Sequence, residues 1–469
     1  MHTAKRLLLL AFFLFLISIS PSLALQTPTE QSPLVGHITH IEGDLLRYTP
    51  DVDEWVATVK DAPCGTDDIL FANTNSRAEL IMPNSTWIRL GDETHLNITE
   101  IGSEITEIDV ESGTARLYNK SSAATMKAST PFGTIKLPPQ TTCDLYLEDD
   151  SILITTLKGS IDFLHVANNT HYGITAGTLS LKADLNQATT SEELLDDSWH
   201  SWNAERDGLW EERFAEQEDS PSYLPENLQY ESYALEENGT WENVYYEGSY
   251  RNLWRPRCVS RGWSPFTVGR WTVWYGDHCW IPCEPFGYIT HHYGNWVYLD
   301  SCRQWYWAPP GCVRGSFYSI GSSWYPGRVS WIYRGSYIGW TPLSPFEPYY
   351  SCRYWGPRSS VIVKGRTYHP HYDKKHYRYK NHSIIVWKDN FYKVSNYNKV
   401  RLQKVRDNVI DNYHRASHIN SRVIRNLKEK RQRFNFNNRK VKYRPNLTIA
   451  KKLRQKKGRE STFLRKGKA

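Results

Sequence analysis

The sequence predicts a mostly β protein of several segments, and three observations support this prediction. Between residues 34 and 186, short stretches with alternating apolar side chains are separated by glycine-containing turns. Between residues 254 and 355, 12 Trp, 12 Tyr and 4 Phe occur in 102 residues. The 469-residue chain is also too long for one compact core, so we expect two or three domains. Its 40% hydrophobic content excludes a wholly disordered protein.

Residues 1–24 are predicted to be a cleavable signal peptide. Lys5 and Arg6 precede an apolar run from Leu7 to Ile19, and a pattern of small residues ends at Ala24. The run has 13 residues, whereas a membrane-spanning helix needs about 20. We therefore expect a periplasmic or secreted protein, in a compartment where disulfides persist. An uncleaved membrane anchor is the alternative.

Residues 34–186, called the β-domain, are predicted to form a β-sandwich or β-meander. Period-2 alternation is visible in Ala78–Met82, Trp87–Leu90 and Asp144–Leu147. Glycines such as Gly43 and Gly159 interrupt the pattern at intervals that suit short strands. The segment contains no nucleophile-and-base spacing, phosphate loop or metal-ligand cluster.

The β-domain resembles the FecR-type domain. The resemblance rests on Val35–Ile38, Gly43–Leu45, Asp67–Leu70, Ala78–Leu80, Ser129–Gly133, Leu157–Ile161 and Ile174–Gly177. It implies an extracytoplasmic β-structure, known best from regulators that relay a ligand signal through the membrane to a sigma factor. Those regulators carry a membrane helix before the domain, whereas this sequence has a predicted signal peptide there. Sigma regulation is therefore not expected.

Residues 190–250, the acidic connector, are predicted to be partly helical. Thr190 and Glu193 make a capping box, and apolar residues then recur at helical spacing, so we expect a helix from Ser191 to Glu218. Between Ser191 and Ser249 there are 17 acidic and 2 basic residues, a net charge of −15. Such a run usually forms a solvated face. Docking of the basic tail and attraction of calcium are the alternatives.

Residues 254–355, the aromatic module, are predicted to be built from repeated two-stranded units. Gly269-Arg270-Trp271 is echoed 25 residues later by Gly294-Asn295-Trp296, and units this small must stack on one another. The span resembles a Trp/Tyr-rich domain of unknown function that follows FecR-type domains in exported bacterial proteins. The residues that carry this resemblance are Trp202, Glu205–Asp207, Trp263–Pro265, Gly269–Trp271, His292–Tyr298, Trp305–Pro309, Val329–Trp331 and Ile338–Leu343.

Two roles are open for the aromatic residues of this module. They can form its core through burial and cross-strand pairing, or some of them can be exposed and stack on sugars or peptides. The candidate stacking surface consists of Trp263, Trp271, Trp280, Tyr293, Trp296, Trp305, Trp307, Trp331 and Trp340. Asp277, Glu284 and Asp300 could serve a glycosidase, but their spacing selects no carboxylate pair.

The cysteine content indicates disulfides. Six cysteines lie in the aromatic module and two in the β-domain, an even count that suits an exported protein. The disulfide candidates are Cys64, Cys143, Cys258, Cys279, Cys283, Cys302, Cys312 and Cys352, with no pairing predicted. The alternative is a zinc site made by Cys279, Cys283, Cys302 and Cys312 with His278, His291 or His292.

Residues 364–469, the basic tail, hold 32 basic and 6 acidic residues, a net charge of +26 that the overall +7 hides. The tail is predicted to be partly helical between Asn398 and Arg433 and otherwise disordered on its own. His369, His371, Asp373, His376 and His382 could capture a metal, but a solvated strand or coil is favoured. No metal or cofactor is predicted.

The sequence favours a non-enzymatic exported envelope protein with a binding or scaffold role. The charge of the tail attracts polyanions in a salt-dependent way, so envelope polysaccharide, another anionic polymer or a membrane surface is the expected partner. Nucleic acid is not expected as a partner, since the chain is predicted to be exported. The alternative is an extracytoplasmic ligand-sensing component that acts through a protein partner. A cell-wall hydrolase is less favoured than either.

Overall fold

The structure is a computed structural model that describes residues 32–193, 196–216, 220–311, 323–363, 366–367, 378–403, 413–414, 436 and 443–455. The predicted signal peptide lies outside these residues. Within them, no helix is both long and apolar enough to cross a bilayer. The predicted mostly β architecture, with a short helical connector, is confirmed.

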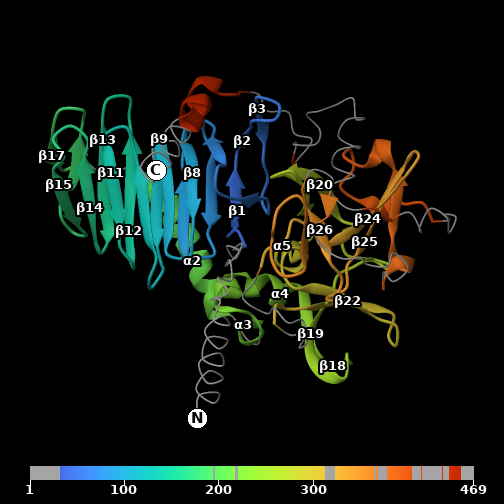
Figure 1. The fold of residues 1–469 in the computed structure, drawn as a ribbon. Coiled ribbons are helices and arrows are strands. Elements are labelled where there is room, and N and C mark those ends of the chain that lie inside the picture. The colour runs from blue at the N-terminus through green and yellow to red at the C-terminus, as the bar shows by residue number, and fades with distance from the viewer. Residues whose placement is uncertain are drawn as a thin grey trace, which may run out of the picture. The chain divides into compact units, whose positions relative to one another are not determined.

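The β-domain consists of two sheets, A and B, that share one long strand, β9 (Figure 1). In spatial order, sheet A contains β4 (Pro63–Cys64), β1 (Gly36–Glu42), β6 (Arg77–Ile81), β7 (Thr86–Leu90), β9 (Ile105–Asn119), β12 (Thr141–Leu147), β13 (Ile152–Lys158), β16 (Ser180–Ala183) and β17 (Ala188–Ser191). Sheet B contains β3 (Glu54–Ala57), β2 (Leu45–Thr49), β5 (Ile69–Ala72), β8 (His95–Ile101), β9, β10 (Thr125–Ser129), β11 (Gly133–Leu137), β14 (Ser160–His165) and β15 (His171–Thr175). Neighbouring strands are antiparallel except β9 and β10.

Strand β9 passes from sheet B to sheet A at Gly113. Residues up to Ser112 pair with β8, and residues from Gly113 onward pair with β12. Gly113 has a φ of +86°, and a Cβ atom there would lie 2.5 Å from the Cα of Thr94. A side chain at this position would therefore be strained by both its backbone conformation and its neighbour. The crossing lets apolar residues of both sheets, such as Leu117 and Ile135, share one core.

The acidic connector is helical, but its first helix starts later than predicted. Ser191 ends strand β17, and the helix begins with Asp196 as its N-cap, whose side chain accepts a hydrogen bond from the Ser198 amide. The predicted start at Ser191 is wrong because the capping-box residue Thr190 pairs with Leu181 in sheet A. The connector contains α2 (Asp197–Ala215), α3 (Ser220–Tyr223), η1 (Glu226–Glu231) and α4 (Ser232–Asn238).

Residues 239–355, which include the end of the acidic connector and the aromatic module, are built mainly from β-hairpins and contain one short α-helix among the residues described. Their elements and those that follow are β18 (Gly239–Tyr246), β19 (Ser249–Pro256), β20 (Gly269–Trp274), β21 (Asp277–Pro282), α5 (Gly287–His292), β22 (Asn295–Leu299), β23 (Gln304–Ala308), β24 (Val329–Arg334), β25 (Tyr337–Pro342), β26 (Tyr349–Ser351), β27 (Ser359–Val363), β28 (Arg366–Thr367), η3 (Lys380–His382), β29 (Ile384–Trp387), η4 (Lys388–Asn390), η5 (Tyr397–Lys399) and β30 (Tyr413–His414).

Each of four hairpins carries a tryptophan directly opposite another across its two strands. The pairs are Trp241 with Trp254, Trp271 with Trp280, Trp296 with Trp307, and Trp331 with Trp340. The ring centroids of Trp271 and Trp331 lie 4.7 Å apart, so rings from different hairpins also pack together. Cross-strand aromatic pairs stabilise two-stranded units that bury little else. The predicted stacking of small repeated units is observed.

Parts of the basic tail belong to the folded structure. Strand β29 pairs with β25, and β30 pairs with β24, so Tyr413 lies in a strand and not in the predicted helix. Residues 447–455 are helical, although this part of the tail was expected to be disordered on its own. Ala450 and Leu453 of this helix are buried against an apolar cluster on sheet B that includes Trp55. Most of the remaining tail lies outside the described residues.

Because β9 crosses between the sheets at Gly113, we predict that alanine at Gly113 lowers stability much more than alanine at Gly173. Gly113→Ala should lower the free energy of unfolding by about 1 to 3 kcal/mol, because alanine is strained at this φ. Gly173→Ala is the control, since a Cβ atom there would meet nothing within 4 Å, and it should change stability by less than about 0.5 kcal/mol. Urea unfolding followed by circular dichroism measures both. Equal effects of the two variants would contradict this role of Gly113.

Candidate functional site

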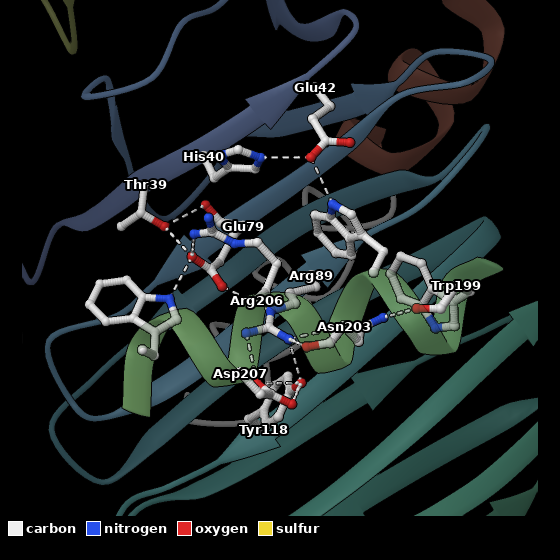
Figure 2. Close-up of polar contacts among 12 residues, drawn as sticks. Thr39, His40, Glu42, Glu79, Arg89, Tyr118, Trp199, Asn203, Arg206 and Asp207 are labelled. Atoms are coloured by element: carbon white, nitrogen blue, oxygen red, sulfur yellow. Dashed lines mark hydrogen bonds and ion pairs between the residues drawn. The ribbon is translucent and has the colours of Figure 1, made fainter. Parts of the chain in front are cut away.

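Helix α2 is held on the outer face of sheet A by buried polar contacts (Figure 2). Its buried residues recur at helical spacing along one face: Trp199, Trp202, Asn203, Arg206 and Trp210. The periodicity explains why this sequence forms a helix with one buried face. That face is unusual in carrying charged and amide side chains as well as tryptophan.

Glu79 of β6 is the centre of this network and is fully buried. Its Oε1 accepts hydrogen bonds from Arg206 at 2.6 Å and from Trp210 at 2.9 Å, both on α2. Its Oε2 accepts from Arg89 of β7 at 2.9 Å. Burial acts to raise the pKa of Glu79, but Arg89 and Arg206 outweigh it and hold the pKa at about 2. Glu79 is therefore ionised at neutral pH, and its contacts hold helix α2 of the connector on sheet A.

Arg89 adds further contacts between the sheet and helix α2. Its Nη2 lies 2.8 Å from Asp207 Oδ1, and its Nη1 donates to the hydroxyl of Tyr118 at 2.7 Å. The Asn203 carbonyl oxygen accepts a further bond from Arg89 at 3.0 Å. Figure 2 shows these groups lying between the helix and the strands beneath it.

A second buried cluster, around His37, joins the β-domain, the acidic connector and the aromatic module. His37 of β1 lies 2.5 Å from Glu231 of the connector and 2.9 Å from Asp61. Its ring stacks on Tyr288 of α5, with centroids 3.5 Å apart and planes at 4°. The hydroxyl of Tyr288 donates to the Gly36 carbonyl at 3.2 Å. Burial disfavours the charged ring, but Glu231 and Asp61 outweigh it and raise the pKa of His37 to about 9.

A third cluster links sheet B to hairpin β20–β21 beside a cavity of about 680 Å³. Arg47 lies 3.6 Å from Asp68, whose other oxygen accepts a bond of 3.4 Å from Trp274 Nε1. The hydroxyl of Tyr275 donates to the Thr66 carbonyl. Burial raises the pKa of Asp68, against the opposing charge of Arg47.

Arg47 is the residue of this cavity best placed to meet a ligand. It is 3% exposed, and one of its nitrogens donates to the Pro63 carbonyl. Its Nε and Nη1 are buried and have no hydrogen-bond partner among the described residues. Buried polar groups are normally satisfied. The cavity is lined by Arg47, Tyr48, Thr49, Pro50, Asp51, Asp67, Asp68, Ile69, Asn97, Val273, Trp274, Tyr275, Gly276, Phe436, Leu453 and Arg454.

The nine rings of the predicted stacking surface are in the core. Trp263 is the most exposed of them at 8%, and Trp271, Trp280, Trp307 and Trp340 are at 0%. Tyr293, Trp296, Trp305 and Trp331 are also buried. Trp263 and Trp305 line a hollow of about 550 Å³, and the nine rings together do not form one exposed surface. The sequence could not distinguish a paired, buried tryptophan from an exposed one.

Aromatic side chains in the segments that flank the module are exposed. Tyr245 and Tyr250 are 61% and 71% exposed and lie opposite each other in hairpin β18–β19. Trp387 is 45% exposed and packs against Tyr337. Sequence reasoning did not single out these rings. For Tyr245 and Tyr250, the turn between β18 and β19 was the available signal, because turn-flanking residues are often exposed.

The three carboxylates considered for a glycosidase, Asp277, Glu284 and Asp300, lie in different environments. Asp277 is buried and accepts from the Cys352 amide and the Trp355 indole, both at 2.8 Å. Glu284 accepts from Trp263 at 3.1 Å, and burial raises its pKa to about 8. Asp300 is exposed. Nothing in these contacts brings two of them together as a catalytic pair.

No disulfide joins two of the seven cysteines that the structure describes. Cys64, Cys143 and Cys279 are buried, and Cys258, Cys283, Cys302 and Cys352 are exposed. Disulfides therefore stay a prediction for this chain, and Cys312 lies outside the described residues.

Within the described part of the chain, no group of three His, Cys, Asp or Glu could hold a metal ion. The zinc candidates His291 and His292 are buried, and burial lowers their pKa to about 3 and 4. His278 donates or accepts a bond of 2.7 Å with the Tyr392 hydroxyl. Of the five metal candidates in the tail, His382 is described and packs on Tyr298. His369, His371, Asp373 and His376 lie outside the described residues.

Comparison with protein families matches two segments of the chain. Residues 68–162 match the family described as FecR protein. Residues 232–347 match the family of unknown function DUF6600. The chain contains a FecR-type domain followed by a DUF6600 domain. Both resemblances expected from the sequence are thereby confirmed, and the DUF6600 match begins inside the acidic connector.

Comparison with solved structures finds a candidate anti-sigma factor from Parabacteroides distasonis ATCC 8503, in crystal structures at 1.65 and 2.50 Å. Each match has 14% sequence identity and a TM-score of 0.24, and covers 27% of this chain. The match spans 59% of that protein's chain. Comparison with curated proteins finds no significant match.

The Glu79 network predicts that replacing Glu79 by the similarly sized glutamine strongly destabilises the fold. Glu79→Gln should lower the free energy of unfolding by about 3 to 5 kcal/mol, because the buried Arg206 would lose its carboxylate partner and Arg89 would keep only Asp207. Glu205→Gln, an exposed change on the same helix, should cost less than about 0.5 kcal/mol. Urea unfolding at neutral pH measures both. Similar small losses in both variants would show that the network does not hold the helix.

The His37 cluster predicts a loss of stability at alkaline pH. The pKa of His37 is raised from 6.5 to about 9 on folding, so its contribution is complete below pH 6.5 and disappears as the pH rises through about 9. Within that window the free energy of unfolding should fall by at most about 1.4 kcal/mol per pH unit.

The control for this prediction is the His37→Gln variant, measured over the same pH range. Glu284 and Lys120 also have a pKa of about 8, so the difference between wild type and variant isolates the imidazole. Parallel stability profiles of the two proteins would contradict the prediction.

Proposed function

We propose that the protein is a non-enzymatic extracytoplasmic sensing component that binds a small ligand and acts through a protein partner. The observation that supports this proposal is the cavity between sheet B and hairpin β20–β21, which presents unsatisfied N–H groups of the buried Arg47. A ligand with an acceptor group would complete the hydrogen bonding of Arg47. The FecR match is consistent with a regulatory role.

The cavity is suited to transmitting a signal because the β-domain and the aromatic module both supply its walls, together with three residues of the basic tail. Arg47 and Asp68 come from the β-domain, and Trp274 and Tyr275 come from the aromatic module. A ligand that contacts both walls favours the arrangement in which they are close, and it shifts the population toward that arrangement. A partner that recognises this arrangement would then report ligand binding. We propose a periplasmic or secreted location for this activity.

The scaffold function favoured by the sequence is the second candidate. The basic tail supports it through its charge, and one tail residue, Arg378, pairs with Glu247 of the acidic connector. This contact is of the kind expected if the tail docks on acidic segments of its own chain. Binding of envelope polysaccharide or another anionic polymer by the tail remains part of this second proposal.

The sensing proposal predicts small-molecule hits in a thermal-shift screen of the full chain. At least one compound with a carboxylate or amide acceptor should raise the melting temperature of wild type. Asp51→Trp, at the exposed rim of the cavity, should abolish that shift, because the indole would fill the entrance. Asp149→Trp, an exposed change elsewhere on the β-domain, should leave the shift unchanged.

Hits that are equally strong in Asp51→Trp would place the ligand elsewhere and contradict the proposal. A screen without hits, together with sedimentation of the chain by insoluble envelope polymers, would favour the scaffold function.

A further inference from the structure

A second hollow, distinct from the Arg47 cavity, is lined by five arginines. It has a volume of about 550 Å³ and shares no lining residue with that cavity. Its arginines are Arg255, Arg257, Arg261, Arg303 and Arg401. We call this site the arginine hollow. No Asp or Glu is among the described residues that line it.

The arginines come from separate parts of the chain, so the fold assembles the hollow. Arg255 lies in β19, Arg257 and Arg261 follow that strand, and Arg303 precedes β23. Arg401 comes from the basic tail and donates to the Gly262 carbonyl at 3.4 Å. Arg257, Arg261 and Arg303 are exposed. A cluster of this kind is unfavourable without an anion, because like charges repel one another.

Neighbouring acidic groups neutralise only part of this charge. Arg255 pairs with Glu242 at 2.6 Å, and Asp300 acts on His382 at the edge of the hollow. Glu284 bonds to the indole of Trp263, one of the lining residues. The pKa of Glu284 is raised to about 8 by burial, so this carboxyl is largely uncharged at neutral pH.

A buried hydroxyl provides an independent indication of a ligand. Ser264 lines the hollow and is 5% exposed, and its Oγ has no hydrogen-bond partner among the described residues. Tyr298, Trp305 and His382 add flat rings to the wall, with the Tyr298 and His382 centroids 4.0 Å apart. The basic residues that line the wall are arginines, with no lysine among them. Arginine binds planar or tetrahedral oxyanions through paired N–H donors, which lysine cannot do.

From this geometry we infer that the arginine hollow binds a phosphate group, with Arg261 and Arg303 as its exposed donors and Ser264 as a hydroxyl donor. The two negative charges of a phosphate group match the positive charges of two or more arginines. No carboxylate is among the described residues that line the hollow. The phosphate can belong to a soluble phosphorylated compound or to a phospholipid headgroup. Since the hollow and the Arg47 cavity are separate, this inference is independent of the proposed sensing function.

Isothermal titration of the full chain with inorganic pyrophosphate tests the inference. The double variant Arg261→Gln/Arg303→Gln should weaken binding by at least tenfold, since both exposed charged donors are lost. Ser264→Ala should weaken binding several-fold without lowering the melting temperature. Arg353→Gln, an exposed arginine of the same module outside the hollow, removes one charge and should leave the affinity unchanged.

Co-sedimentation with phosphatidylcholine vesicles, with and without phosphatidylglycerol, tests the lipid source. Binding of either pyrophosphate or phosphatidylglycerol that depends on Arg261 and Arg303 supports the inference and identifies the source. If neither probe binds, or if Arg353→Gln weakens binding as much as the double variant, the inference is wrong. In the second case, the attraction would come from the overall charge of the basic tail.

Discussion

The buried carboxylate of Glu79 is the interaction on which the rest of the structure depends. It takes hydrogen bonds from Arg89 in its own sheet and from Arg206 and Trp210 in helix α2. A buried ion pair contributes little net stability, because desolvation offsets most of the attraction, but loss of one partner is costly. Its main effect here is therefore to define the position of α2.

The connector reaches the aromatic module through a second buried contact. Glu231 at the end of η1 meets His37 of the β-domain, and Tyr288 of the module stacks on the same ring. Hairpin β20–β21 then contacts sheet B through Trp274 and Asp68. Both clusters place ionisable groups between domains, where packing of apolar groups alone would be less specific. The Arg47 cavity lies beside the second cluster and depends on both domains.

The sequence predicted the fold better than the site. Alternation in Ala78–Met82 and Trp87–Leu90 identified strands correctly, because one face of each strand packs in the core. The same alternation treats Glu79 and Arg89 as residues of a solvent face, yet α2 covers that face. No local pattern reveals which strands a helix more than 100 residues later will cover. The burial of the nine rings in the candidate stacking surface was not predicted for a related reason: strand pairing, and not composition, decides which tryptophans meet and become buried.

Native-state hydrogen exchange of the full chain most directly tests the claim that Glu79 and His37 join the β-domain, connector and aromatic module into one cooperative unit. The account predicts that slowly exchanging amides of β7, α2 and α5 open with one common free energy, and that Glu79→Gln lowers all three together. If the amides of α2 exchange at a clearly lower free energy than those of β7 in wild type, the helix opens independently. That result would contradict the account.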